Sequence, residues 1–209
     1  MTWATWWLFT CATAIVVASP GPNMLHIMVQ SVRFGFARSI VSMAGCLTAV
    51  LICVTASSLG LGALLMTSHT LFGVLRYVGV AYLLYLAWKS WTAGVPAADA
   101  GATVPAAGGG STFALYRAAL LTGLSNPKLI VFAAAFFPQF IRADRPWAPQ
   151  FAILVGTFAV IEVACYTAYA AGGRRLATAL SSPARRRLFN RLTGAAFGTF
   201  GIGLFAWRA

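Results

Sequence analysis

The sequence predicts an all-α, polytopic membrane protein with one domain over residues 1–209, and three observations carry this prediction. Hydrophobic residues make up 60% of the chain and charged residues only 9%, whereas about a quarter of the residues in a soluble domain are charged. The apolar residues gather in segments of about 20 residues, the length that crosses a bilayer as a helix. Two of these segments are interrupted by proline, at places about half a chain apart.

Six transmembrane segments meet this length. The first contains one break and begins with Trp3, Trp6 and Trp7, which suit a membrane interface. It has no basic residue in front of it, so we expect a retained helix rather than a signal peptide. The second and third are continuous, the fourth contains the other break, the fifth holds one acid and the sixth is rich in glycine. The segments run from about Thr5 to Ile27, Ile40 to Met66, Leu71 to Trp88, Phe113 to Phe140, Phe151 to Ala171 and Leu192 to Trp207.

A stretch rich in alanine, glycine and proline, residues 92–112, separates the third segment from the fourth. Such a composition has little capacity to pack, and we expect a flexible linker. The linker divides the domain into two halves of three helices, residues 1–91 and 113–209. Because three is odd, the halves cross the membrane in opposite directions, and a discontinuous helix comes first in each half. This is the inverted-repeat arrangement of many secondary transporters.

Basic residues set the expected orientation of the chain, whose net charge is +12. They gather in the first loop, beside the linker and in the fifth loop, and the positive-inside rule places these three loops in the cytoplasm and both termini outside. The arginines of the fifth loop could also bind anionic headgroups of membrane lipids. Since the basic residues lie between apolar segments, we expect no binding of nucleic acid. The basic residues are Arg33 and Arg38, Lys89 and Arg117, and Arg174, Arg175, Arg185, Arg186, Arg187 and Arg191.

The two breaks read Ser19-Pro20-Gly21-Pro22-Asn23 and Ser125-Asn126-Pro127-Lys128. Proline cannot continue a helix interior, and in lipid the backbone groups that it frees need partners in protein or water. A pair of such breaks, one in each half, is therefore the best pointer in a sequence to a transporter's binding site. The half-helix after each break presents N–H groups and a positive dipole end, which suit a carboxylate. We expect the substrate site to comprise Pro20, Gly21, Pro22, Asn23, Asn126, Pro127 and Lys128.

Several polar side chains at or near the breaks allow more than one role. Asn23 and Asn126 can cap the half-helices or hydrogen-bond the substrate. Lys128 can bind a substrate carboxylate, pair with Glu162 or extend to the cytoplasmic interface. Glu162 lies in mid-membrane, where an acid is costly unless protonated, paired or in contact with water. We expect it to couple transport to protons or to bind an ammonium group, and the alternative is a protonated structural residue. A lone histidine such as His26 is more often structural.

Other functions find little support in the sequence. With only three acids, Asp99, Asp144 and Glu162, the chain has no cluster for two catalytic metals and no nucleophile motif, so we do not expect an enzyme. Cys46 and Cys53 lie seven residues apart and support one alternative, the efflux of a heavy-metal cation or other small solute by the same fold. The ligand spacing and histidine partners of a metal site are missing, and we expect no cofactor.

Glycines at four positions of the sixth segment predict a close approach to another helix. These residues are Gly194, Gly198, Gly201 and Gly203. Small-residue faces of this kind would also permit a homodimer, although the sequence does not demonstrate one.

At these residues the chain resembles the LysE/RhtB family of amino-acid exporters over nearly its whole length. The matching blocks are Ser19 to Asn23, Gly79 to Leu83, Asn126 to Lys128 and Phe136 to Phe140, with Asn190, Gly194 and Gly201 in the final segment. The resemblance implies an exporter of amino acids in the bacterial cytoplasmic (inner) membrane, driven by proton antiport.

Two departures from the family's pattern bear on the substrate. Members that export basic amino acids carry an acid in the second helix and another shortly after the Asn-Pro motif, whereas Thr48 and Phe132 stand at these positions here. The resemblance therefore implies a neutral substrate of the homoserine, threonine or branched-chain type. In the resulting hypothesis the amino acid binds between the breaks and the halves rock around it. Glu162 binds a proton from outside and releases it inside.

Overall fold

The computed structural model describes residues 1–67, 69–92, 111–142 and 144–206. Most of the expected linker, residues 93–110, lies outside the described residues. All regular structure in the described part is helical, which confirms the expected class. The helices are α1 (Trp3–Ala18), α2 (Pro22–Phe34), α3 (Phe36–Thr67), α4 (His69–Thr92), α5 (Thr112–Leu124), α6 (Pro127–Val131), α7 (Trp147–Ser181) and α8 (Pro183–Ala206). A π-helical turn (Phe132–Phe136) and a 3-10 turn (Phe137–Phe140) continue α6.

Both expected breaks interrupt a helix. The first separates α1 from α2 and the second separates α5 from α6, and each pair is bent by 54°. Pro22 and Pro127 occupy the first positions of α2 and α6. A proline costs no hydrogen bond there, because the N–H groups of a first turn have no partner within the helix, and its fixed φ favours a new helix. The prolines thus end one helix and begin the next.

Helix length and apolar composition identify fewer spans than the sequence predicts. The stretches Phe36–Leu59 of α3 and Trp147–Gly173 of α7 are long and apolar enough to cross a membrane. Each bent pair would add one span, which gives up to four among the described residues. The arrangement of six spans in two inverted repeats therefore stays a prediction.

The prediction of a loop between the fifth and sixth segments is wrong, because the arginines assigned to it lie in helices. α7 continues to Ser181 and α8 begins at Pro183, so Ser182 alone separates them. The hydropathy of a segment indicates which part of a helix can lie in the hydrocarbon of the membrane. It does not indicate where the helix ends. Alanine and arginine both favour helix, so the helices continue beyond the apolar segments. The helices bring Arg175 and Arg185, both exposed, beyond the expected apolar segments.

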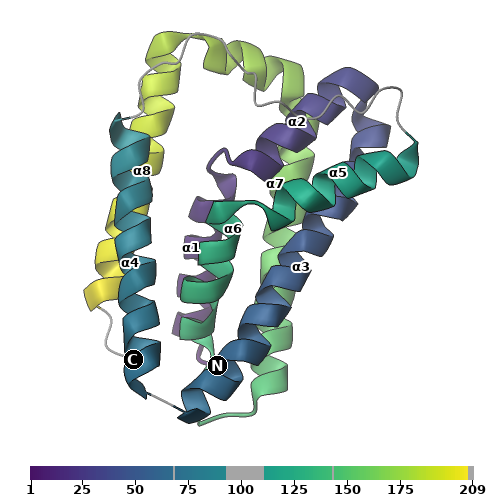
Figure 1. Cartoon of the computed structure of the whole chain (residues 1–209). Coiled ribbons are helices and arrows are strands. Elements are labelled where there is room, and N and C mark those ends of the chain that lie inside the picture. Colours follow the sequence, from purple (N-terminus) through teal and green to yellow (C-terminus); the bar gives the residue numbers. More distant parts are fainter. Residues whose placement is uncertain (68, 93–110, 143, 207–209) are drawn as a thin grey trace.

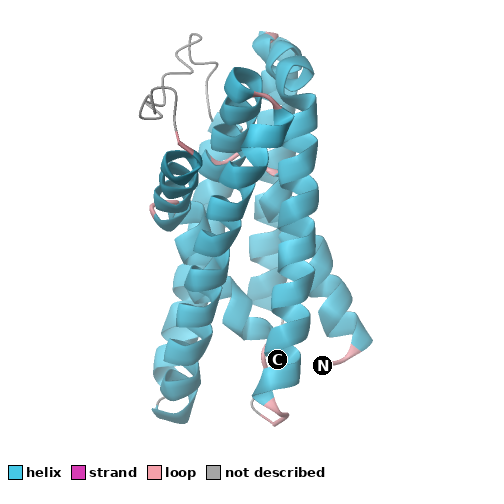
Figure 2. Ribbon diagram, turned by 90° about the vertical axis from the view of Figure 1, so that its right-hand side faces the viewer, coloured by secondary structure: helices cyan, strands magenta, loops and turns pink. Residues whose placement is uncertain are grey.

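Several basic segments meet at one end of the molecule, which we call the basic end. The α2–α3 turn, the end of α4 and the α7–α8 turn lie at the top of Figure 1, and the N-terminus lies at the bottom. Figure 2 shows the long helices running between these two ends. The last turns of α2 and α4 carry Arg33 and Lys89. This grouping agrees with the expectation that the basic segments share one side of the membrane.

Helix packing places the two breaks at the centre of the molecule. α8 packs along α4, while α5 and α7 pack along α3, and α1 and α6 lie between these groups (Figure 1). A Cβ added at Gly194 would lie 2.8 Å from the carbonyl oxygen of Ala87, so the expected close approach of the last helix is confirmed there. Gly203 meets no atom within 4 Å and takes no part in it.

A cluster of phenylalanines fills the space between the breaks and the N-terminal end. Phe9 of α1 packs edge-on against Phe137 and Phe140, with ring centroids 5.8 and 5.1 Å apart. Phe136 packs on Phe140 at 4.8 Å. All four side chains are at most 2% exposed, and buried rings at these spacings attract one another. We call Phe9, Phe136, Phe137 and Phe140 the aromatic plug.

Candidate functional site

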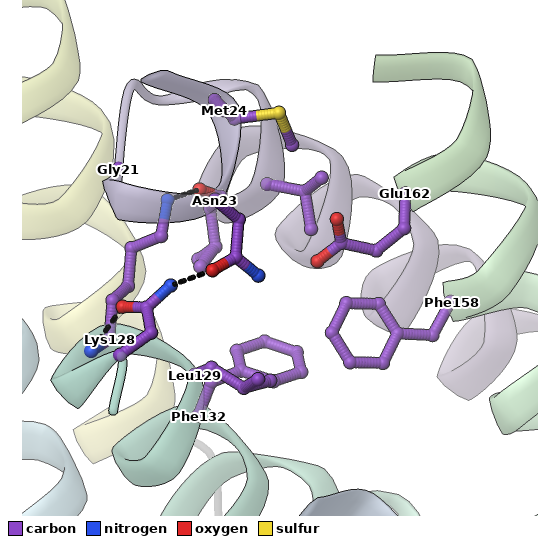
Figure 3. A pocket seen from close by; sticks show the side chains of 11 residues that line it. Gly21, Asn23, Met24, Lys128, Leu129, Phe132, Phe158 and Glu162 are labelled. Atoms are coloured by element: carbon purple, nitrogen blue, oxygen red, sulfur yellow. Dashed lines mark hydrogen bonds between the residues drawn. The ribbon is translucent and has the colours of Figure 1, made fainter. Parts of the chain in front are cut away.

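A pocket lies where the two breaks meet α7. Its walls are the end of α1, the first turn of α2, α6 with the turn that follows, and the middle of α7 (Figure 3). Its volume is about 20 Å³, and a single water needs about 10–15 Å³, so in this conformation the pocket has room for a water but not for an amino acid. The lining residues are Val16, Val17, Gly21, Asn23, Met24, Asn126, Lys128, Leu129, Phe132, Phe158 and Glu162.

The first break leaves the start of α2 without a side-chain cap. Gly21 is the N-cap residue, in an extended conformation, and no side chain accepts a hydrogen bond from the first turn. The backbone N–H of Leu25 donates to the Gly21 carbonyl at 3.0 Å. The N–H groups of an uncapped first turn carry the positive end of the helix dipole. Gly21, Asn23 and Met24 of this turn line the pocket.

The second break is capped by its own side chain. Asn126 is the N-cap of α6, and its Oδ1 accepts a hydrogen bond from the Lys128 backbone N–H at 3.0 Å. Its Nδ2 donates to Oδ1 of Asn23, also at 3.0 Å. Asn126 and Asn23 are both buried. One amide therefore caps its own helix and joins the second break to the first.

Lys128 crosses from the second break to the end of α1. Its Nζ donates to the carbonyl oxygens of Val16 at 3.0 Å and Ser19 at 2.8 Å, and lies 3.2 Å from Ser19 Oγ. The last carbonyls of a helix have no partner within it and carry its negative dipole end. An ammonium group has three donors, and here all three are used. Lys128 thus holds the end of α1 and brings a positive charge to the pocket wall.

Gly21 leaves the space that the lysine needs. A Cβ added at Gly21 would lie 3.0 Å from Lys128 Nζ and 3.1 Å from its Cε. These separations are tighter than ordinary van der Waals contact, so a side chain at position 21 would require the end of the lysine to shift by a few tenths of an ångström. The glycine of the first break is therefore explained by the lysine of the second.

The contacts between the breaks follow a reciprocal pattern. Gly21 and Asn126 are the N-caps of α2 and α6, and Asn23 and Lys128 are their second helical residues. The cap of α6 bonds the second residue of α2, and the second residue of α6 lies against the cap of α2. Each break thus meets the other through the same pair of positions.

Glu162 of α7 lies across the pocket from Lys128 (Figure 3). Its side chain is 6% exposed and its carboxylate hydrogen-bonds the Tyr166 hydroxyl, which accepts from Asn23 Nδ2 at 3.3 Å. The other carboxylate oxygen, Oε2, has no partner among the described residues. The pocket therefore has one acid with a free oxygen on one side and one ammonium group on the other.

The structure brings together five of the eight residues expected at the site. Gly21, Asn23, Asn126, Lys128 and Glu162 line the pocket. The other three do not line it: Pro22 and Pro127 are exposed and begin helices, and Pro20 is partly buried beside them.

Sequence reasoning missed the apolar wall of the pocket and Tyr166. Phe158 and Tyr166 lie one turn before and one turn after Glu162, on the same face of α7. That spacing is a signal that could have identified both. Val16 and Val17 are ordinary apolar residues near the end of α1, and nothing in the sequence distinguishes them from their neighbours.

The cysteines of the metal alternative are not joined by other ligands. Cys46 is buried and its Sγ donates to the Ala119 carbonyl at 3.6 Å, whereas Cys53 is only partly buried. No group of three His, Cys, Asp or Glu side chains that could hold a metal occurs among the described residues.

Comparisons with known proteins agree with the sequence resemblance. Residues 14–206 match the model of the family described as LysE type translocator. A homoserine/homoserine lactone efflux protein of Salmonella typhimurium is 31% identical over 208 residues, which cover 100% of this chain and 99% of that protein. A leucine efflux protein of Salmonella choleraesuis is 31% identical over 165 residues, 78% of this chain and 76% of that protein. An uncharacterized membrane protein of Vibrio cholerae is 30% identical over 97% of this chain and 98% of its own length. No solved structure matches the chain.

Proposed function

Because this chain belongs to the LysE family of translocators and is a transporter rather than an enzyme, we propose that it exports neutral amino acids by proton antiport across the bacterial cytoplasmic membrane. The observation that carries the proposal is the pocket between the two breaks, with Lys128 on one side and Glu162 on the other. An amino acid is a zwitterion, and its two charges match the two sides of this pocket.

The substrate carboxylate binds at the first break. The uncapped start of α2 offers backbone N–H groups and a positive dipole end, and Lys128 adds its charge beside Gly21. Asn126 already accepts a bond from the first turn of α6, so that helix has less to offer an anion. Since all three donors of Lys128 are used by α1, direct binding of the carboxylate to Nζ would release one bond to α1.

The substrate ammonium group binds at Glu162, whose free Oε2 is buried at the pocket. The same oxygen is the natural acceptor of a proton. An ammonium group and a proton cannot occupy one carboxylate together, so each reduces the affinity for the other. Competition of this kind yields antiport, because the carrier returns with a proton after it releases the amino acid.

The rest of the pocket favours a neutral side chain. Apart from Glu162 and Lys128 its lining carries no charge, and six of its residues are apolar. These residues are Val16, Val17, Met24, Leu129, Phe132 and Phe158. An ionised lysine or arginine side chain would lose its hydration there without a second carboxylate to compensate it. Homoserine, threonine and branched-chain amino acids meet this requirement.

Transport requires the helices around the pocket to part, since an amino acid is larger than the pocket. Rocking of two inverted halves would open the site to one side at a time. The reciprocal contacts between the breaks support this arrangement, because each half holds the other at equivalent positions. Lys128 and the Asn126–Asn23 bond would then be the contacts that change as the halves move.

The experiment is counterflow in proteoliposomes. Vesicles loaded with unlabelled amino acid receive labelled threonine, homoserine, leucine or lysine, with and without a pH gradient. We expect exchange of neutral amino acids, stimulation of net transport by the gradient, and loss of that stimulation in Glu162→Gln. Asn23→Ala and Asn126→Ala should lose exchange as well.

Two results would contradict the proposal. Exchange of lysine alone would show that the pocket accepts a second positive charge and that the substrate class is wrong. Full gradient-driven transport in Glu162→Gln would remove the carboxylate from proton coupling. Folding of each variant is checked by size-exclusion chromatography of the purified protein.

A further inference from the structure

A line of buried polar side chains runs along α2 from the pocket toward the basic end. Asn23, His26 and Gln30 stand at spacings of three and four residues and share one face of the helix. They are 5%, 2% and 2% exposed. At about 1.5 Å per residue the line covers roughly 10 Å, and it ends one turn before Phe34, where α2 ends. We call these three residues the polar stripe.

Two of the three stripe residues have a polar atom without a protein partner. Nε2 of His26 and Oε1 of Gln30 are buried and unbonded, and so is the hydroxyl of Ser42 on the adjacent α3. The other ring nitrogen of His26, Nδ1, lies 3.5 Å from Thr122 Oγ1 of α5. Burying a polar atom without a partner costs stability, and such atoms in native proteins serve water or chemistry. The stripe therefore has unused hydrogen-bonding capacity in the half of the molecule next to the basic end.

The other side of the pocket is different. The aromatic plug lies there, and its four rings pack on one another. The unpartnered buried side-chain atoms described in the remainder of the structure, apart from Glu162 Oε2, are the hydroxyls of Thr13 and Ser58. Neither hydroxyl titrates near neutral pH, whereas an imidazole does. In this conformation the chemistry for moving a proton therefore lies on the side of the pocket that faces the basic end.

We propose that His26 passes the proton between Glu162 and the basic end of the protein. This proposal rests on the proton antiport proposed above. Protonated Glu162 gives up its proton through water to Nε2 of neutral His26, which leaves a carboxylate and an imidazolium. The imidazolium then releases a proton to water beside Gln30, which restores the neutral ring. Glu162 is free to take the substrate ammonium group, and no charge remains on the stripe.

The other titratable groups near α2 are already engaged or are poor carriers near neutral pH. Cys46 of α3 donates to Ala119 and Tyr116 of α5 donates to Thr48. Tyr169 of α7 donates to Ala18, and Lys128 is bound to α1. The remaining described groups on the packed elements are Cys53 of α3 and Cys165 and Tyr166 of α7, with exposed Arg38, Arg117 and Arg175 at the surface. Among the described residues, Glu162 and His26 are the titratable groups that have an unbonded buried atom.

The experiment compares two kinds of transport in proteoliposomes. Counterflow exchanges one amino acid for another and requires no net proton release, whereas net transport driven by a pH gradient requires it. His26→Gln keeps a hydrogen-bonding side chain of similar length but cannot carry a proton, and His26→Leu removes both properties. We expect both variants to keep counterflow within about twofold of the wild type and to lose gradient-driven transport at least tenfold. Thr13→Val, which removes an equally buried unpartnered hydroxyl beyond the pocket, should keep both activities.

The remaining outcomes overturn the proposal, and they are distinguishable. If the wild type ignores the gradient, antiport itself fails and the role of His26 fails with it. If the wild type responds and His26→Gln responds equally, only the assignment of His26 is wrong. If both histidine variants lose counterflow in proportion to net transport, His26 serves substrate binding or folding and not the proton. Amino-acid-driven pH change inside the vesicles, followed with a trapped dye, gives the proton movement directly.

Discussion

The two breaks look alike in sequence, but their residues cap the following helices differently and make different contacts. Each has a proline at the first position of a new helix and a bend of 54°. The first has Gly21 as its cap and leaves α2 open to the pocket. The second has Asn126, which caps α6, and Lys128, which reaches back to α1. The second break therefore holds the end of α1, and the first turn of α2 is left without a side-chain cap.

This difference shows how two breaks with the same bend can differ in the contacts that their residues make. Equivalent positions of the two half-helices meet each other, but one pair is a lysine over a glycine and the other is an amide on an amide. Lys128 lies against the N-cap of α2, and there is room for it because the N-cap residue, Gly21, has no side chain. We expect substitutions at the second break to affect both breaks, and substitutions at the first to act mainly through Lys128.

The largest effect is expected for Lys128→Met. It leaves the buried carbonyl of Ser19 without its donor, at about 1–3 kcal/mol, while the Val16 carbonyl keeps the Ser19 hydroxyl at 2.6 Å. It also leaves Glu162 without the positive charge across the pocket. We expect loss of amino-acid exchange and a lower unfolding temperature for the purified protein. Lys89→Met, which removes an exposed lysine at the end of α4, should change neither. Normal exchange by Lys128→Met would mean that the second break does not support the first.

Gly21→Ala should have the next largest effect, because its Cβ would press on Lys128 Nζ at 3.0 Å. Crowding of a packed site typically costs about 1–3 kcal/mol, and we expect exchange to fall at least tenfold. Gly156→Ala on α7, where an added Cβ meets no atom within 4 Å, is the matched control.

A double-mutant cycle tests whether the effect of Gly21→Ala passes through Lys128. Unfolding of Gly21→Ala, Lys128→Met and the double variant should give a coupling of about 0.5–3 kcal/mol. Additive losses would show that the two breaks act independently at this contact.

Asn126→Ser separates the two roles of the second cap. Serine caps a helix as well as asparagine does but is too short to reach Asn23, so the variant keeps the cap and loses the bond between the breaks. We expect a loss of stability near 1 kcal/mol and a clear loss of exchange, whereas Asn126→Ala should lose about 1 kcal/mol more. Thermal unfolding and counterflow measure the two quantities. A serine variant that exchanges like the wild type would make the amide pair unnecessary.

The smallest effect is expected outside the breaks, at the ion pair before α7. Arg142 donates two hydrogen bonds to Asp144, at 2.9 and 2.8 Å, and they hold the pKa of this carboxyl below its usual value of 3.8. A lowered pKa stabilises the folded state above the usual value, and the contribution is lost as the pH falls through the lowered value. Both groups are exposed, and such pairs contribute little. Asp144→Asn should therefore barely change the unfolding temperature at pH 7 and should not change it in strong acid. A large change of the unfolding temperature at pH 7 would contradict this.

The sequence was sufficient for the breaks because their cause is local. Proline cannot continue a helix interior, so Pro20, Pro22 and Pro127 locate the two interruptions without any tertiary information. Glu162 was equally evident, since an acid in an apolar segment has few structural explanations. The helical class followed from composition in the same way.

Contacts between distant segments could not be predicted from the sequence. Lys128 is bonded to Ser19, 109 positions away, and three roles for it remained open until the helices were placed. The extension of α7 to Ser181 could not be predicted from hydropathy. Hydropathy indicates whether a segment suits lipid or water, and it does not indicate the secondary structure of the segment. The polar stripe was missed because His26 and Gln30 gain meaning only once α3 and α5 bury them.

The most direct test of the central claim is the pH dependence of amino-acid binding to the purified protein. If the proton and the substrate ammonium group compete for Glu162, the dissociation constant for the transported neutral amino acid should rise about tenfold for each pH unit below the apparent pKa of the site. Glu162→Gln should bind more weakly and show no such slope. Wild-type binding that is independent of pH, or an unchanged slope in Glu162→Gln, would contradict the account.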